Sequence, residues 1–350
     1  MSNNTIAVYG ASGFQGALVL AELDRRGGTV ILAGRDAEKL ESAAAQANLT
    51  DAEVRVATVD DGAALVAAFR GADAVINCAG PFTPTGARVV DAAVAAGAHY
   101  VDTCGEQLFL HEIYRTRSAA AESAGVTVVP AATDGGVPGD LLARLIADRL
   151  GPLAELTSVH RFGGDAAMSR GSIRTMLGVA DTMADGGVAY LDGAWRPGPF
   201  DQLAPVILPG GTEPVAVGSF PLQEAVSVPR HTSIRNVRGA VEESTRALFA
   251  TPLTDDMIEA LPMGPTAAQR AAGTWTIVLD VVAVDGRRAR GVIEGTDTYG
   301  TTASIAVEAA RRLVADPPAA GVLAPAQAFD PADFLAALTP HGVRWSIDID

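Results

Sequence analysis

Short apolar runs alternate with amphipathic segments through the first 150 residues of the chain. The apolar runs predict strands at 5–9, 29–33, 54–59, 74–78, 100–104 and 126–130. The amphipathic segments predict helices after residue 16 and at 37–47, 63–70, 86–96, 108–123 and 141–150. Because parallel strands need helical crossovers, this half of the chain predicts an α/β fold with a doubly wound parallel sheet.

The pattern changes after Gly151-Pro152, which ends the helix predicted at 141–150. Beyond this point we expect a strand at 156–162, a helix at 169–183 and short strands such as 224–228 within a Gly- and Pro-rich stretch. The segment 274–284 predicts a long strand that turns at Asp285-Gly286 into a partner at 290–294. Helices are predicted at 302–314 and 331–338. Antiparallel connections and few helices indicate an inserted α+β second domain.

Three glycines follow the first predicted strand, at positions 10, 13 and 16 of Gly10-Ala-Ser-Gly-Phe-Gln-Gly16. Glycine has no Cβ, so a dinucleotide pyrophosphate can approach the backbone closely. The N–H groups and the dipole of the following helix then hold the phosphates. Strand, glycine turn and helix together predict a Rossmann-type dinucleotide site.

The end of the second predicted strand bears on which dinucleotide binds there. Gly34 comes first past this strand and Arg35 follows it. An arginine there accommodates the 2′-phosphate of NADP, whereas an acidic residue favours NAD. We therefore expect NADP, with NAD the less favoured cofactor. Asp36 is the competing acidic residue, and its alternative role is the N-cap of the next helix.

Further cofactor contacts are expected at the carboxyl ends of the strands, where open α/β sheets bind their ligands. Asp60 could contact the adenine or lie in a solvated turn. The small residues of the loop 78–82 permit close approach to the pyrophosphate and nicotinamide ribose. The predicted cofactor residues are Gly10, Ser12, Gly13, Phe14, Gln15, Gly16, Arg35, Asp60, Cys78, Ala79, Gly80, Pro81, Thr103 and Cys104.

Composition narrows the class of protein and its partners. A net charge of −15 argues against nucleic-acid and anionic-membrane partners. Two cysteines without metal-ligand spacing predict no metal site and favour a reducing cytoplasm, and no apolar run is long enough for a membrane span. We expect a soluble cytoplasmic protein with a small-molecule substrate, whose apolar C-terminal half could bury a homodimer interface.

Lys39 is the only lysine, and this excludes one class of enzyme that shares this glycine spacing. Short-chain dehydrogenases and sugar-nucleotide epimerases use a tyrosine followed by a lysine four residues later. Position 35, four residues before Lys39, holds arginine. That catalytic pair is therefore absent from the chain.

Three blocks together resemble the saccharopine dehydrogenase-like oxidoreductases, including the trans-acting enoyl reductase branch. The blocks are Gly10–Gly16, Ala79–Thr83 with Tyr100–Glu106, and Thr133–Asp140. The resemblance implies an NADP-binding Rossmann domain at 1–150 plus about 320–350. The C-terminal residues would complete the sheet of this domain. It also implies an α+β substrate domain at 151–319 and hydride transfer to or from a C=N or C=C bond.

Hydride transfer asks of the side chains mainly orientation and a proton source or sink. Asp102, after the fifth strand, is a candidate acid, with organisation of its loop as the alternative. Asp134, flanked by glycines after the sixth strand, is the second catalytic candidate, while Asp140 would cap or charge the next helix. The predicted substrate residues are His160, Arg170 and Arg174, with Ser169 as an N-cap beside the arginines.

The combined prediction is an NADP-dependent oxidoreductase that acts on a C=N or C=C bond of a small or medium metabolite. The alternative is a non-catalytic NADP-binding sensor or partner protein on the same fold. A large second domain favours the enzyme, because a sensor needs no substrate compartment.

Overall fold

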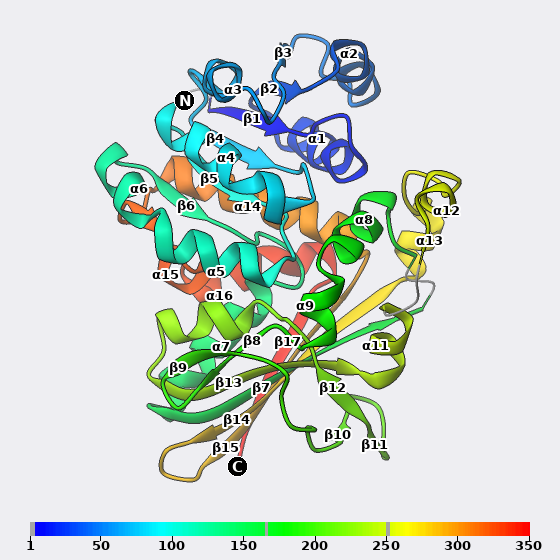
Figure 1. Cartoon of the computed structure of the whole chain (residues 1–350). Helices are drawn as coiled ribbons and strands as arrows, with labels where there is room; N and C mark the ends of the chain where they lie inside the picture. The colour runs from blue at the N-terminus through cyan, green and yellow to red at the C-terminus, as the bar shows by residue number, and fades with distance from the viewer. Residues whose placement is uncertain (1–3, 165–166, 250–252) are drawn as a thin grey trace. The chain divides into compact units, whose positions relative to one another are not determined.

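Backbone contacts divide the chain into two units, each assembled from separate stretches of sequence. The first unit comprises Met1–Cys104, Phe109–Thr133 and Tyr299–Leu323, and the second comprises Gly105–Leu108, Asp134–Thr298 and Ala324–Asp350. The computed structural model describes residues 4–164, 167–249 and 253–350 (Figure 1).

A seven-stranded parallel sheet forms the centre of the first unit. Its strand order is β16-β6-β5-β4-β1-β2-β3, and each pair of neighbours runs parallel (Figure 1). The strands are β1 (Thr5–Tyr9), β2 (Thr29–Gly34), β3 (Glu53–Val56), β4 (Ala74–Asn77), β5 (His99–Asp102), β6 (Thr127–Val129) and β16 (Gly321–Val322). All four residues of β4 are buried, as expected of a strand covered on both faces. The predicted doubly wound sheet is confirmed.

The helices around this sheet follow the predicted alternation. They are α1 (Phe14–Arg26), α2 (Ala37–Gln46), α3 (Gly62–Phe69), α4 (Phe82–Ala95), α5 (Gln107–Thr116), α6 (Ser118–Ala124) and α14 (Thr298–Ala315). The single helix expected at 108–123 is wrong, because the chain breaks at Arg117 between α5 and α6. The apolar pattern continues through the break, so periodicity did not reveal it.

Ion pairs join α1 to α14 within the first unit. Arg26 pairs with both Glu22 and Glu308, and Arg312 donates to Glu308 at 2.7 Å. The Glu308 side chain is only 17 % exposed. Burial raises the pKa of Glu308, but hydrogen bonds and charge from Arg312 and Arg26 outweigh burial and lower this pKa overall.

This lowered pKa predicts a pH-dependent contribution to stability. A depressed folded-state pKa stabilises the fold above the unfolded value of about 4.3, and the contribution is lost as the pH falls through the folded pKa. We expect Glu308→Gln to lower the free energy of unfolding by roughly 1 kcal/mol at neutral pH and by much less in acid. Denaturant titrations at several pH values measure this, with the exposed Glu41→Gln as control. An equal loss in acid would contradict the assignment.

An eight-stranded mixed sheet forms the second unit. Its main path is β17-β15-β14-β7-β13-β8-β9, with β12 also paired to β13. The strands are β7 (Leu153–Gly163), β8 (Val188–Leu191), β9 (Ala194–Pro197), β12 (Val217–Ser219), β13 (Ile234–Glu242), β14 (Thr274–Ala283), β15 (Arg288–Thr296) and β17 (Arg344–Ile349), and β10 (Val206–Ile207) pairs separately with β11 (Pro214–Val215). Only β7 and β13 run parallel among the main-path neighbours. The predicted hairpin is present as β14–β15, and Gly286 adopts φ +92° in its turn.

The second unit also contains helices, and two elements differ from those predicted from the sequence. The helices are α7 (Val137–Leu150), α8 (Arg170–Gly178), α9 (Ala180–Ala184), α10 (Glu224–Ser227), α11 (Glu243–Phe249), α12 (Asp255–Glu259), α13 (Ala267–Ala272), α15 (Pro325–Ala328) and α16 (Pro331–Leu338), with short 3₁₀ turns η1 (Val228–Arg230) and η2 (Thr339–His341). The helix expected at 169–183 is interrupted at Val179. The strand expected at 224–228 is instead the buried helix α10, because a short apolar run fits either element until its neighbours are known.

The units differ from the domain limits expected from the sequence. We expected 1–150 plus about 320–350 in the first domain, but α7 and residues 324–350 make their contacts in the second unit. Helix α7 packs on β15, where a Cβ at Gly291 would lie 2.8 Å from Ile146. Strand β17 pairs with β15. Of the C-terminal segment, Gly321–Val322 alone joins the parallel sheet, beside β6.

Candidate cofactor and substrate sites

The glycine turn between β1 and α1 is too closely packed for larger residues. Gly10 adopts φ +76°, and a Cβ there would lie 2.9 Å from the nitrogen of Ala79. A Cβ at Gly16 would overlap the Gly10 carbonyl oxygen and lie 2.8 Å from Ala11. Gly13 is the N-cap of α1, no side chain caps this helix, and its first turn holds no acidic residue. These features fit a pyrophosphate at the helix N-terminus.

Two of the predicted cofactor side chains also attach α14 within the first unit. The Phe14 ring meets the Tyr299 ring edge-on with centroids 5.1 Å apart. Gln15 donates its side-chain amide to the Tyr299 carbonyl at 3.1 Å. The side chains of Phe14 and Gln15 thus hold the start of α14. We therefore expect any phosphate contact at positions 14 and 15 to come from the backbone. Ser12, on the preceding turn, is half-buried.

The two charged residues that follow β2, Arg35 and Asp36, have different roles. Asp36 is the N-cap of α2 and accepts a hydrogen bond from the Lys39 backbone at 3.2 Å. Hydrogen bonds from Lys39 lower the pKa of this carboxyl. Arg35 is exposed directly past the strand, where a 2′-phosphate would need a cation. Asp36 is thus occupied as a cap and pairs with Lys39 at 3.0 Å, and Arg35 is the cationic side chain directly after β2.

The pKa of Tyr9, the last residue of β1, is shifted by burial and by two charged side chains. Burial raises the pKa of Tyr9, the positive charge of Arg35 lowers it, and the negative charge of Asp60 raises it again. Asp60 pairs with Arg88 of α4 and its side chain is 80 % exposed, which is the geometry of a solvated turn. Its predicted adenine contact stays a prediction.

The loops after β4 and β5 depend on Asn77, which sequence reasoning missed. Its fully buried side chain accepts from the Ala79 backbone at 2.9 Å and donates to the Tyr100 hydroxyl at 3.0 Å. The Asn77 carbonyl also accepts from the Thr103 backbone at 3.1 Å. The available signal was an amide residue ending a fully apolar strand.

The predicted loop 78–81 carries no activated thiol. Burial raises the pKa of the Cys78 thiol to about 12, although a hydrogen bond with Thr103 opposes the shift. A thiol with this pKa is almost wholly protonated near neutral pH and is a poor nucleophile. Cys104 is buried, and Pro81 is the N-cap of α4. Cofactor contact at Cys78, Ala79, Gly80 and Pro81 therefore stays a prediction based on their position.

Asp102 joins the ends of β5 and β6. Its fully buried carboxylate accepts from the Cys104 backbone at 3.0 Å and from the Ala131 backbone at 2.8 Å. Ala131 adopts φ +59°, a left-handed conformation that is uncommon for a residue with a Cβ. The hydrogen bonds from Asp102 hold this strained backbone, which is a loop-organising arrangement. Its part in catalysis stays a prediction.

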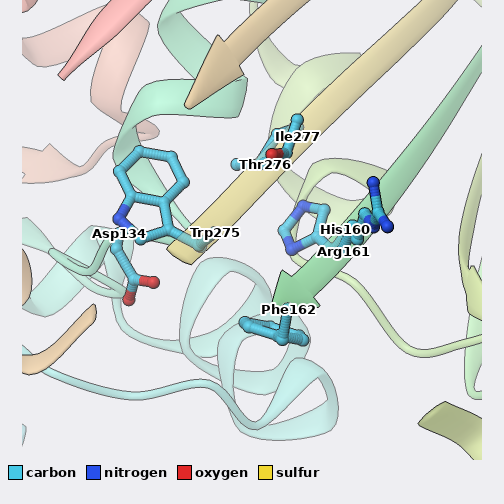
Figure 2. A pocket seen from close by; sticks show the side chains of 8 residues that line it. Asp134, His160, Arg161, Phe162, Trp275, Thr276 and Ile277 are labelled. Carbon is cyan, nitrogen blue, oxygen red and sulfur yellow. The ribbon is translucent and has the colours of Figure 1, made fainter. Parts of the chain in front are cut away.

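A small pocket in the second unit is lined by both Asp134 and His160, which come from different elements of the chain. Figure 2 shows the pocket, and its lining residues are Asp134, Gly135, His160, Arg161, Phe162, Trp275, Thr276 and Ile277. Asp134 is 8 % exposed and Trp275 is 2 % exposed. The wall combines aromatic and aliphatic side chains with a few polar groups, as ligand sites do, but its empty volume of about 170 Å³ is smaller than that of most such sites.

His160 and Arg161 project to opposite sides of β7, as their alternation predicts (Figure 2). The exposed Arg161 pairs with Glu242 at 2.9 Å. The buried His160 lies 2.8 Å from Glu224 of α10, whose side chain is fully buried. Sequence reasoning missed Glu224, because the segment was expected to be a strand. A buried glutamate needs a partner, and that need was the available signal.

Arg170 and Arg174, predicted to hold a substrate carboxylate, hold a carboxylate of the chain instead. Arg170 donates to Glu259 of α12 at 3.0 Å, and Arg174 pairs with the same carboxylate. Ser169 is the N-cap of α8, as predicted, and accepts from the Ser172 backbone at 3.1 Å. With Glu259 between them, the arginines offer a substrate anion less positive charge than the sequence suggested.

The described residues form neither a metal cluster nor a helix that could span a membrane. Within the ranges that the structure describes, no group of His, Cys, Asp and Glu side chains is arranged to hold a metal ion. Among the same residues, no helix has the length and hydropathy needed to cross a membrane. The cytoplasmic location and the homodimer stay predictions.

Comparison with known proteins identifies the N-terminal region. Residues 6–129 match the family model described as the saccharopine dehydrogenase NADP-binding domain. This match agrees with the resemblance stated above for this region and confirms NADP as the expected cofactor. The apo structure of saccharopine dehydrogenase (L-Glu forming) from Saccharomyces cerevisiae has the same fold, with a TM-score of 0.62 and 16 % identity, and covers 99 % of this chain and 100 % of that one.

Two curated relatives match the chain in part. A lipid droplet localized protein from Caenorhabditis elegans is 36 % identical over 151 residues, which are 40 % of this chain and 35 % of that protein. A trans-acting enoyl reductase from Mycobacterium leprae is 31 % identical over 177 residues, which are 48 % of this chain and 42 % of that protein. The chain thus spans less than half the length of these relatives.

Proposed function

Because residues 6–129 belong to the saccharopine dehydrogenase NADP-binding domain family, we propose that the chain is an NADP-dependent oxidoreductase. The proposed reaction is hydride transfer to or from a C=N or C=C bond of a small or medium metabolite. The observation that carries the proposal is the close-packed glycine turn followed by the exposed Arg35. When bound, the nicotinamide supplies or accepts the hydride.

The chain's own residues would bind the two partners of this reaction. The N-terminus of α1 would hold the pyrophosphate and Arg35 the 2′-phosphate. Asp134, His160 and Trp275 would orient a substrate in the pocket of the second unit, where the apolar wall excludes water. The trans-acting enoyl reductase relative favours a C=C substrate, whereas the aspartate and histidine of the pocket suit a protonated C=N nitrogen equally well.

A non-catalytic NADP-binding sensor is the alternative function. A sensor needs only the first unit, whereas an enzyme also needs a substrate compartment. The buried polar groups of the second unit favour the enzyme, because burying them costs stability that a sensor would have no reason to retain.

Turnover distinguishes these two functions. Purified protein with NADPH would be mixed in turn with cyclic imines, with pairs of a 2-oxo acid and an amine, and with enoyl thioesters. We expect substrate-dependent loss of NADPH absorbance with at least one class. Tight NADPH binding, measured by fluorescence, without turnover on any class would favour the sensor.

The preference for NADP is tested at Arg35. A charge-assisted hydrogen bond contributes about 1.5–3 kcal/mol, so Arg35→Ala should weaken NADPH binding roughly 10- to 100-fold. NADH has no 2′-phosphate, and its affinity should not change. Fluorescence titration with both nucleotides measures this. The control is Lys39→Ala in the first turn of α2. An equal loss for both nucleotides would contradict the assignment of Arg35 to the phosphate.

A further inference from the structure

We propose that His160 is the acid–base group of the second-unit pocket and that Glu224 is the positioning residue that fixes its tautomer. The proposal rests on the proposed function, because it supplies the proton that accompanies hydride transfer. It adds a role for His160 and a residue, Glu224, that the sequence did not indicate.

The contact between the two side chains determines which ring nitrogen is available. His160 Nε2 lies 2.8 Å from Glu224 Oε1, and the two side chains are 4 % and 0 % exposed. A carboxylate accepts hydrogen bonds, so Nε2 carries the hydrogen in this pair. In the neutral ring Nδ1 is then the acceptor, free to take or return a proton.

The Nδ1 edge of the ring faces the residue next to Asp134. A Cβ at Gly135 would lie 3.6 Å from His160 Cε1 and 3.7 Å from Nδ1. Gly135 has no side chain that could cover this edge of the ring. Gly135 lines the same pocket as His160 and Asp134, so the ring edge that faces Gly135 is the edge beside the pocket lining.

Glu224 is built into the fold at this position. A Cβ at Gly139 of α7 would overlap Glu224 Oε1, so glycine there leaves room for the carboxylate. Three buried polar atoms nearby, Glu224 Oε2, Gln223 Oε1 and Trp275 Nε1, have no hydrogen-bond partner among the described residues. Leaving such groups buried and unpaired is energetically unfavourable. Trp275 lines the pocket, so its N–H is available to a bound substrate.

The proton step balances with the proposed hydride transfer. In the reductive direction the carbon of the C=N or C=C bond receives the hydride from NADPH. The other atom of that bond keeps the π electron pair and takes the proton from Nδ1 of the imidazolium. NADP⁺ and a neutral imidazole remain, and water protonates the ring again. In the oxidative direction neutral Nδ1 takes the proton.

The first measurement is the tautomer of His160, which requires no substrate. Nitrogen-15 NMR of the wild-type full chain reports which ring nitrogen carries hydrogen, and the His160→Gln variant assigns the signal among the five histidines. We expect the Nε2–H form in the wild type and a redistribution between tautomers in Glu224→Gln. An Nδ1–H form in the wild type would overturn the proposal.

The second measurement is turnover with the imine or enoyl substrate that the wild type accepts. General acid–base catalysis contributes roughly 100- to 10,000-fold, so His160→Gln should lower kcat by about that factor. Glu224→Gln should lower kcat by roughly tenfold or more, and KM for NADPH should stay unchanged in both variants. A change confined to KM would also overturn the proposal.

A second buried carboxylate–histidine pair provides the matched control. His231 Nε2 lies 2.9 Å from Asp140 Oδ1, the side chains are 2 % and 0 % exposed, and neither lines the pocket. Asp140→Asn should leave the His160 tautomer and kcat unchanged while lowering stability. If it lowers kcat as much as Glu224→Gln, the effect of Glu224 is structural and the proposal fails. If the wild type turns over no substrate, the proposed function itself fails, whatever the tautomer.

Discussion

Replacing Gly16 by alanine is expected to weaken NADPH binding roughly 100-fold, or about 3 kcal/mol, because the β1–α1 turn must open to accept the methyl group. The added Cβ would overlap the Gly10 carbonyl oxygen and approach Ala11 at 2.8 Å. Backbone atoms cannot rotate away as a side chain can, so α1 must shift from the end of β1. Overpacking of this kind also costs about 1–3 kcal/mol of stability.

Fluorescence titration with NADPH and denaturant unfolding measure the two effects of Gly16→Ala separately. The matched control is Gly62→Ala at the first residue of α3, where a Cβ would meet nothing within 4 Å. Alanine there should be neutral or stabilise the fold by up to about 1 kcal/mol. Unchanged NADPH affinity in Gly16→Ala would show that the turn does not hold the pyrophosphate.

Replacing Asp140 by alanine is expected to produce the largest loss of stability in the second unit. One oxygen of this fully buried carboxylate lies 2.9 Å from His231 Nε2, and the other accepts from the Ala326 backbone at 2.8 Å. Alanine removes the acceptor of both partners, the buried His231 side chain and the half-buried Ala326 backbone. Removal of one member of a buried pair costs about 3–5 kcal/mol.

Chemical denaturation of Asp140→Ala and Asp140→Asn tests this assignment. Asparagine keeps one acceptor oxygen, so its loss should be smaller, about 1–3 kcal/mol. The control is an exposed ion pair at the β14–β15 turn, where Arg287 contacts the Asp285 carboxylate at 2.9 Å. Asp285→Ala removes this solvent-exposed carboxylate. That loss should be much smaller than the loss at Asp140, because exposed ion pairs contribute little to stability. Equal losses at the two positions would contradict a buried, two-partner role for Asp140.

The two roles of Asp140 illustrate how far sequence reasoning reached. Its place after Pro138-Gly139 predicts a residue that caps or charges a helix, and it does lie in the first turn of α7. The N-cap, however, is Gly136. The carboxylate bonds His231 and Ala326, which lie 91 and 186 residues away in sequence. Nothing local to position 140 indicates such partners.

Local capping was predictable where its partners are close in sequence. Asp36 and Ser169 were given N-cap roles from their neighbours alone, and each accepts the hydrogen bond of a backbone N–H three residues later. Arg170 and Arg174 show the limit of the same reasoning. Their spacing on α8 was correct, yet Glu259, which neutralises them, comes from α12.

The sequence by itself determined the parallel sheet, the glycine turn and, through Arg35 after the second strand, the expectation of NADP, because each depends on a pattern within a few residues. Tertiary structure alone decided that α7 belongs with the second sheet and that 224–227 is a helix. It also brought Glu224 to His160 and Asp134 to Trp275. The physical reason is that burial and pairing join residues far apart in the chain, and a local pattern carries no record of its distant partner.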